Sequence, residues 1–212
     1  MFDAYLRDYF DHFAFQSITT EQMLAYLRAN LVDKHPGKVG WDQVEQWVYA
    51  PGLPESATLP AVPAFTAIDT ARAAFLQGTL GAAALPAKDW NTHEWLYFLD
   101  HLPEAPTLAH VQALDVAWRL SRSSNAEIGM RWLPRAIRAG DSTAWPAARA
   151  TMLRIGRMKL TLPIYRAFAS TPAGLVYAEA AYRAHKAEYH PLTRQAIEKV
   201  LRKAQAQPEA IR

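Results

Sequence analysis

The chain has 212 residues, of which 50% are hydrophobic and 11% aromatic, and this composition predicts a soluble globular protein with a substantial core. The absence of cysteine excludes disulfides, thiolate catalysis and cysteine-ligated zinc. The formal net charge is +3, and no run of roughly 18 apolar residues occurs, so no membrane-spanning helix is expected.

The first 48 residues read as a short helical segment. Residues 2–15 carry apolar side chains at helical spacing, and Ser17 to Gln22 supply capping chemistry for a second helix that runs to about residue 32. A third helix is predicted over residues 41–48. Because the chain begins at once with a charged amphipathic pattern rather than a signal peptide, we expect it to be a piece of a longer protein.

Residues 49–63 contain four prolines and predict an irregular linker, because proline fixes φ and biases the residue before it away from helix. We place the domain boundary in this linker. The predicted organisation is therefore a helical segment at 1–48, a linker at 49–63 and a second domain at 64–212.

The second domain reads as helical throughout, and no stretch alternates with strand period. Asn91 with Glu94, and Thr107, mark helix starts, and Pro134 predicts a kink or a delayed start in its helix. Short loops favour antiparallel neighbours, in a bundle or a stack of helical hairpins. The predicted helices cover residues 64–76, 92–102, 107–121, 125–138, 142–155, 162–169, 172–189 and 191–205, with a short turn at 86–89.

Positive charge is concentrated in one part of the chain. Residues 1–50 hold 4 basic and 7 acidic side chains, a balance of −3, whereas residues 131–166 hold 8 basic side chains against Asp141 alone, a balance of +7. Such a field raises the rate of encounter with carboxylates, and equally with phosphate backbones.

The run 156–163 lies within this basic window, and residues 157–160 of it are predicted to form a short connector between two helices. Gly156 is predicted to end one helix in the left-handed conformation, Thr161 to cap the next, and Pro163 to lie in its first turn. In an extended connector Arg157 and Lys159 would project to one side, beside a helix N-terminus. This arrangement suits a carboxylate, although an ordinary solvated connector is the alternative.

Five segments in order resemble one family. The run Gly156-Arg157-Met158-Lys159 with Thr161 and Pro163 resembles the C-terminal helical domain of the leukotriene-A4 hydrolase-like zinc aminopeptidases, a gluzincin family. The other segments span nearly the whole chain: Ser17-Ile18-Thr19-Thr20, Tyr49-Ala50-Pro51-Gly52-Leu53-Pro54, Asn125-Ala126-Glu127-Ile128 with Arg131-Trp132-Leu133, and His185-Lys186-Ala187 with His190-Pro191 and Thr193.

The resemblance implies an all-α fold, a two-layer armadillo-like α-α superhelix of about nine helices, preceded by the tail of a catalytic domain. It implies that Arg157 binds the free carboxylate of a short peptide or lipid substrate and that Lys159 assists. The parent enzyme would be a cytoplasmic zinc aminopeptidase whose catalytic domain, the zinc and the catalytic residues lie upstream. The implied partners are that domain and a peptide, with no nucleic acid and no membrane.

No zinc-peptidase motif of two histidines four apart, with a glutamate between them, is present. His185 and His190 are five apart and diverge by about 140° on a helix, so we expect neither a metal site nor activity from this chain alone. Arg131, Arg135 and Arg138 share a helical face, which predicts an ion-paired or solvated stripe more than a ligand site. The spacing also predicts a pair between Glu127 and Arg131.

Tryptophans at helical apolar positions are predicted to be core residues, with Trp90 and Trp95 alternatively lining a groove. Two functions remain open. The first is the accessory domain of a zinc aminopeptidase, which closes the active-site cleft and anchors the substrate carboxylate. The second is a free-standing helical-repeat scaffold that binds a protein or, in the weaker form of this alternative, a nucleic acid through its basic face.

Overall fold

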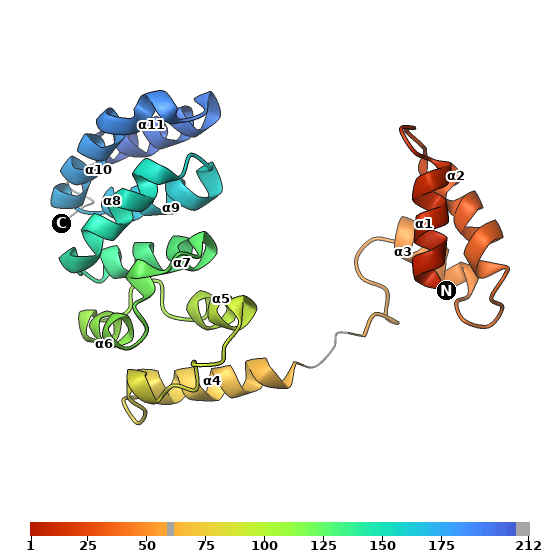
Figure 1. Cartoon of the computed structure of the whole chain (residues 1–212), viewed down its shortest axis with the longest axis horizontal. Helices are drawn as coiled ribbons and strands as arrows, with labels where there is room; N and C mark the ends of the chain where they lie inside the picture. The colour runs from red at the N-terminus through yellow and green to blue at the C-terminus, as the bar shows by residue number, and fades with distance from the viewer. Residues whose placement is uncertain (59–61, 207–212) are drawn as a thin grey trace. The chain divides into compact units, whose positions relative to one another are not determined.

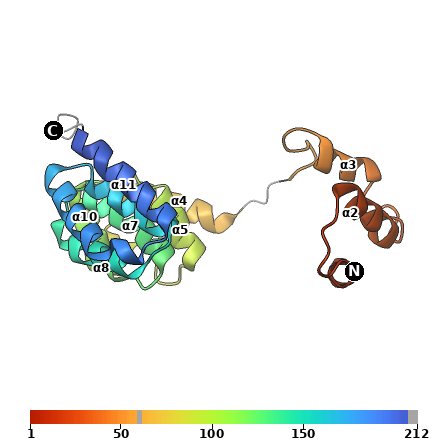
Figure 2. The ribbon, with the colours of Figure 1, turned by 90° about the horizontal axis from the view of Figure 1, so that it is seen from above.

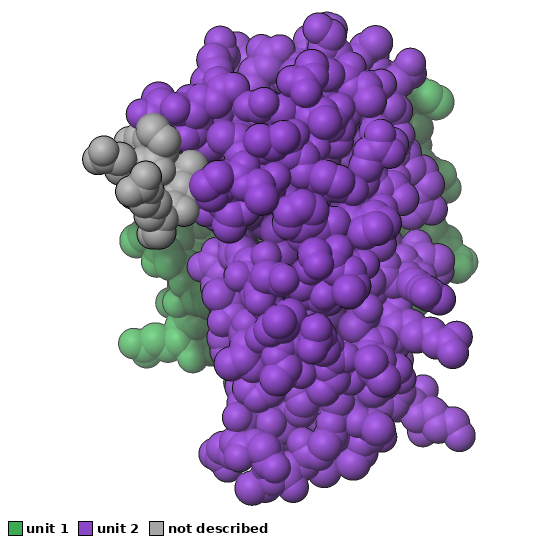
Figure 3. Space-filling model, turned by 90° about the vertical axis from the view of Figure 1, so that its left-hand side faces the viewer, with its two compact units in different colours: residues 1–61 green, residues 62–212 purple. Residues whose placement is uncertain are grey.

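The computed structural model describes residues 1–58 and 62–206, and all the regular elements in these ranges are helical (Figure 1). The all-α prediction is confirmed. The chain divides into two compact units, residues 1–61 and 62–212, which are coloured separately in Figure 3. Residues 59–61 of the predicted linker lie outside the described residues.

Unit 1 contains α1 (Phe2–His12), α2 (Thr20–Leu27) and α3 (Trp41–Tyr49), with a π-helical turn after α2 at Arg28–Val32. The predicted cap is present: the Thr19 hydroxyl accepts a hydrogen bond from the Gln22 amide, and the Gln22 side chain accepts one from the Thr19 amide. In these three helices only Tyr5 and Leu24 are buried hydrophobic residues. The core of this unit is therefore small.

Unit 2 contains α4 to α11, which follow one another from one end of the unit to the other in Figure 1. In the view from above, α11 is nearest the viewer (Figure 2). The helices α5, α7, α9 and α11 form one row in which each packs on the next, and α8 packs on α10 beside it. The bounds are α4 (Pro63–Leu76), α5 (Thr92–Asp100), α6 (Leu108–Trp118), α7 (Ala126–Arg138), α8 (Trp145–Arg154), α9 (Met158–Phe168), α10 (Pro172–His185) and α11 (Pro191–Ala206), with 3₁₀ turns at Ala82–Ala84, Leu120–Arg122, Ser142–Ala144 and Lys186–Glu188.

Polar caps explain where several of these helices begin. The Asn91, Thr107, Asn125 and Thr171 side chains each accept a hydrogen bond from an amide in the first turn that follows. The starts predicted at Asn91 and Thr107 are confirmed. The armadillo-like geometry named by the resemblance stays a prediction.

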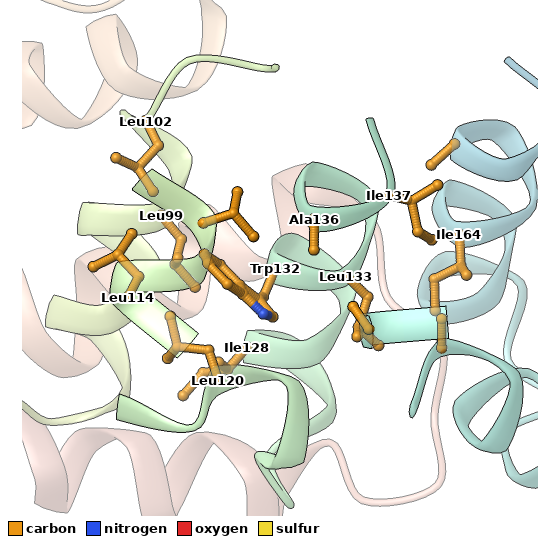
Figure 4. Packing of buried hydrophobic residues seen from close by; sticks show 14 of the residues in the cluster. Leu99, Leu102, Leu114, Leu120, Ile128, Trp132, Leu133, Ala136, Ile137 and Ile164 are labelled. Carbon is orange, nitrogen blue, oxygen red and sulfur yellow. The ribbon is translucent and has the colours of Figure 1, made fainter. Parts of the chain in front are cut away.

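Helix α7 lies at the centre of the core, with buried side chains on both of its sides (Figure 4). Trp132 is fully buried against leucines of α5 and α6, and its indole N–H donates to the Ser121 hydroxyl at 2.9 Å. On the other side Leu133 and Ile137 face Ile164 of α9. These contacts fix the position of α7 relative to α9.

Two predictions need correction, one about Pro134 in unit 2 and one about the tryptophans of both units. Pro134 does not delay the start of its helix, because α7 begins at Ala126 and continues through the proline, and the alternative of a kink stays a prediction. The prediction that tryptophans are core residues holds for Trp95 and Trp132, which are buried, but is wrong for Trp47, which is 55% exposed in unit 1.

Candidate functional site

The predicted connector is shorter than expected, because α9 begins three residues before Thr161. Arg157 is the N-cap residue, and its carbonyl accepts hydrogen bonds from the amides of Leu160 and Thr161 at 2.9 and 3.2 Å. Thr161 is buried inside α9, where its hydroxyl donates back to the Arg157 carbonyl at 3.3 Å. The expected roles of Thr161 as a cap and of Pro163 as a first-turn residue are therefore wrong.

The physical reason is the apolar face of α9. Leu160, Ile164 and Phe168 are four residues apart and all are buried, so extending the helix back to Met158 places Leu160 in the core. Gly156 is also not left-handed, because α8 ends at Arg154 and Ile155 is already extended, with φ −116° and ψ 116°. The connector consists of residues 155–157.

Neither the Arg157 nor the Lys159 side chain is buried. Because Lys159 is helical, the period-two argument that placed both side chains on one side no longer applies. Among the described residues, no ion pair and no hydrogen bond is formed by the Arg157 guanidinium, and the first turn of α9 has no side-chain cap. Arg157 and this helix end are therefore both available to an anion.

The backbone before Arg157 is held by residues that we call the buried flank: Met152, Tyr165, Tyr189 and Thr193. The Thr193 hydroxyl donates to the Gly156 carbonyl at 3.3 Å. The Tyr189 hydroxyl donates to the Met152 carbonyl in α8, and lies 3.3 Å from the Tyr165 hydroxyl. Since Tyr189 has one proton and gives it to Met152, Tyr165 is the donor of the second bond.

Burial also decides the protonation of this flank. Burial raises the pKa of Tyr165, and its hydrogen bond with Tyr189 raises it further. Burial likewise raises the pKa of Tyr189, although the hydrogen bond with Tyr165 acts in the opposite direction. Both phenols therefore stay neutral at physiological pH, and the flank carries no charge.

Four charged side chains of α5, α7 and α9 form a second cluster that we call the ionic flank: Asp100, Glu127, Arg131 and Lys159. Lys159 donates to Glu127 Oε1 at 2.7 Å, and Arg131 Nη1 donates to Glu127 Oε2 at 3.0 Å. Arg131 Nε also donates to both carboxylate oxygens of Asp100, at 2.7 and 2.8 Å. The charges alternate in sign from α9 through α7 to the end of α5.

The hydrogen bond from Lys159, followed by the one from Arg131, lowers the pKa of Glu127. Burial by itself lowers the pKa of Arg131, but the hydrogen bonds to Asp100 and Glu127 outweigh burial and raise it. The side chains of Lys159, Glu127 and Arg131 are 51%, 31% and 19% exposed, so the flank becomes progressively less solvated toward Arg131.

The arginine stripe on α7 is mostly structural, as its spacing predicts. The expected pair of Glu127 with Arg131 is confirmed, and Arg138 lies 3.4 Å from Glu104. Arg135 donates to the Arg131 carbonyl at 2.8 Å, and burial lowers its pKa. The contact of Glu127 with Lys159 was missed, because the two residues are 32 positions apart and meet only where α7 packs on α9.

Across residues 1–58 and 62–206, no three histidine or acidic side chains lie close enough together to hold a metal. The His190 ring nitrogen accepts a hydrogen bond from the Leu192 amide at 3.2 Å, which places His190 at the start of α11, as expected of a helix terminus. None of the helices in these residues is both long enough and apolar enough to span a membrane.

Comparisons with known proteins converge on one family. A profile described as "Leukotriene A4 hydrolase, C-terminal" matches residues 90–201. The chain is 30% identical to leukotriene A-4 hydrolase of Xenopus laevis over 209 residues, which cover 95% of this chain and 34% of that protein. It is also 30% identical to leucine aminopeptidase 2 of Eremothecium gossypii, over 93% of this chain and 35% of that protein.

The fold agrees with this match. The structure of native yeast LTA4 hydrolase superimposes with a TM-score of 0.70 at 24% identity, over 94% of this chain and 35% of that one. The chain thus spans about a third of the length of the relatives that it matches.

Proposed function

The chain belongs to the leukotriene A4 hydrolase C-terminal family, and from this membership we propose that it is the C-terminal part of a zinc aminopeptidase. The parent enzyme removes N-terminal residues from short peptides in the cytoplasm. This part packs against the catalytic domain, closes one side of the active-site cleft and anchors the carboxylate of the substrate.

Arg157 is the residue that we assign to the carboxylate, with Lys159 assisting. The observation that carries the assignment is the contrast between Arg157 and its neighbours: Lys159 and Arg131 are ion-paired, whereas Arg157 has no acidic partner in the described part of the chain. A guanidinium presents a planar fork to a carboxylate, and the uncapped first turn of α9 adds amides that favour an anion.

In this proposal the zinc of the parent enzyme is bound by its catalytic domain and not by the residues of this chain. The described residues hold no group of three potential ligands, and the chain has no cysteine, so the residues present do not fit a zinc ion. No step of catalysis is therefore assigned to this chain. Its own contribution is to position the substrate, which lowers the entropy cost of reaching the reactive geometry.

The test is a kinetic comparison in the full-length peptidase. Arg157→Ala should reduce kcat/KM on free-acid tripeptides roughly 30-fold to 900-fold, because a charge-assisted bidentate contact is lost. This fold-change corresponds to a loss of about 2–4 kcal/mol of transition-state stabilisation. Peptides with an amidated C-terminus have no carboxylate and should lose far less. Arg157→Lys should recover part of the activity, since an ammonium lacks the planar fork. Equal losses on acid and amide would refute the assignment.

The alternative function, a free-standing scaffold that binds through a basic face, has less support. Arg131 and Arg138 are paired with Asp100, Glu127 and Glu104, so much of the positive charge on α7 is already neutralised. A phosphate backbone would have to displace these carboxylates.

A further inference from the structure

We propose that unit 2 carries a further anion site, which Arg157 does not line and which binds a small acid with a flat aromatic ring. The site is a cavity of about 440 Å³, lined by α5, by the end of α6 and by the connection from α6 to α7. Cavities of this size hold small-molecule ligands. We call it the arginine cavity, and its wall includes two tryptophans and two arginines: Trp95, Trp118, Arg119 and Arg122.

The charged side chains that line the arginine cavity are all positive. Arg119 and Arg122 line it, and no acidic side chain from residues 1–58 or 62–206 does so. None of the ion pairs formed by the described residues of unit 2 includes either guanidinium. Both arginine side chains are exposed, so their planar forks are available to an acid.

A neighbouring cavity of about 540 Å³ is also lined by the two arginines, but it contains the carboxylates of Asp115 and Asp141. Both carboxylates are bound to other groups. Asp115 Oδ1 accepts a hydrogen bond from the Ser121 amide at 2.7 Å. Asp141 Oδ1 accepts hydrogen bonds from the amide and the hydroxyl of Thr143 at 3.1 and 2.7 Å. These carboxylates repel an anion from the neighbouring cavity, which leaves the arginine cavity as the site.

The backbone of Arg119 is strained. Arg119 is the C-cap residue of α6 and has the left-handed conformation, with φ 51° and ψ 41°. In the described part of unit 2 no other residue except glycine has a positive φ. Glycine adopts this conformation without the steric cost that a side chain brings. Strain of this kind is concentrated at binding sites, so an arginine here indicates a function for the side chain.

Hydrogen bonds on both sides hold the strained turn in place. The Arg119 amide donates to the Asp115 carbonyl at 2.8 Å, and the Arg122 amide donates to the Arg119 carbonyl at 2.9 Å. The Ser121 hydroxyl accepts the indole N–H of the buried Trp132 at 2.9 Å, which ties the turn to α7. The two arginines are therefore carried by a fixed turn, which reduces the entropy cost of binding.

The aromatic part of the wall is fixed as well. The Trp118 indole N–H donates to the Ala82 carbonyl at 2.9 Å, and the rings of Trp95 and Trp118 lie 5.7 Å apart at an angle of 65°. A flat ring packs on tryptophan with favourable aromatic contacts, while its acid group binds a guanidinium. An aromatic carboxylate and a nucleoside monophosphate both offer this combination of ring and acid.

The test is isothermal titration calorimetry with the full-length peptidase. Indole-3-acetate and adenosine monophosphate are the probes, and their separate parts, which are indole, acetate, adenosine and phosphate, are the reference ligands. At least one probe should bind with a Kd below about 1 mM and at least tenfold more tightly than either of its parts, since ring and acid both contribute. The probe that binds identifies the acid as a carboxylate or a phosphate.

Substitutions locate the binding. Arg122→Gln should weaken it about tenfold, because a charge-assisted hydrogen bond is lost. Arg119→Gly should weaken it by a similar factor without lowering the midpoint of thermal unfolding, since glycine relieves the left-handed conformation. Arg149→Gln removes an exposed arginine of α8 that lines neither cavity, and should leave the affinity unchanged. Arg157→Ala should also leave it unchanged, because the arginine cavity does not include Arg157.

Several results would overturn the site. They are the failure of both probes to bind, binding that disappears in Arg157→Ala, and unchanged affinity in Arg119→Gly and Arg122→Gln. A loss in Arg149→Gln as large as that in the two cavity variants would also overturn it, because the effect would then be one of net charge. The function proposed for Arg157 is measured on peptide substrates and does not depend on any of these results.

Discussion

The buried flank and the ionic flank are each held together by different physics. On the buried side, hydroxyl groups of Tyr189 and Thr193 bond to backbone carbonyls, and both residues are 3% exposed. On the ionic side, Lys159 and Glu127 meet in partly solvated surroundings, where an ion pair contributes little to stability. The comparison teaches that the backbone directly before Arg157 and the charges that begin at Lys159 are controlled by separate residues, and should respond to separate substitutions.

The largest effect should come from the buried flank. Tyr189→Ala removes a buried ring and its hydrogen bond to the Met152 carbonyl, and should lower the free energy of unfolding by about 3–5 kcal/mol. For a chain of this size, the midpoint of thermal unfolding should fall by roughly 6–20 °C. The fall in the midpoint is measured by thermal unfolding followed by circular dichroism.

Two controls sharpen this prediction. Tyr189→Phe keeps the ring and should cost only about 1–2 kcal/mol, because it leaves the Met152 carbonyl without its donor. Glu127→Ala on the ionic flank should cost less than Tyr189→Ala. If the two alanine variants destabilised the protein equally, the distinction between the flanks would be wrong.

A smaller effect is expected where the buried flank reaches the connector. Thr193→Val keeps the shape of the side chain and removes the hydroxyl that donates to the Gly156 carbonyl, at a cost of about 1 kcal/mol. Thr193→Ser should retain the bond. Hydrogen exchange should show faster exchange of the Leu160 and Thr161 amides in the valine variant, since both close the first turn of α9 onto the Arg157 carbonyl. Unchanged exchange would mean that the Thr193 hydroxyl does not hold the connector.

Local features of this protein were predictable from the sequence. Capping at Thr19, Asn91 and Thr107 depends on side chains within three residues of the amide they bind, and the pair of Glu127 with Arg131 follows from helical spacing. Such signals are visible because the partners are neighbours in the chain.

The start of α9 shows where local signals fail. Thr161 and Pro163 are typical of a helix start, yet the helix begins at Met158, because the burial of Leu160 with Ile164 and Phe168 outweighs the cap. The contacts that surround the site are also non-local: Thr193 is 37 positions from Gly156, and Lys159 is 32 from Glu127. They arise only when α9 packs between α7 and α11, which no periodicity encodes.

The smallest predicted effect is a difference between the two flanks in how the change in unfolding free energy on substitution depends on pH. The pKa of Glu127 is lowered in the folded protein by Lys159 and then Arg131, so its contribution to stability is present above the unfolded pKa and is lost as the pH falls through the folded pKa. The difference in unfolding free energy between wild type and Glu127→Gln should therefore be greatest near neutral pH, below about 1 kcal/mol for a partly exposed pair, and should shrink on acidification. Salt should also weaken this difference.

The buried flank provides the control. Its tyrosines have raised pKa values and do not titrate in this range, so the difference in unfolding free energy between wild type and Tyr189→Phe should stay constant. Urea unfolding at pH 7 and pH 3 measures both differences, and a pH-independent difference for Glu127→Gln would show that the ionic flank acts through packing rather than charge.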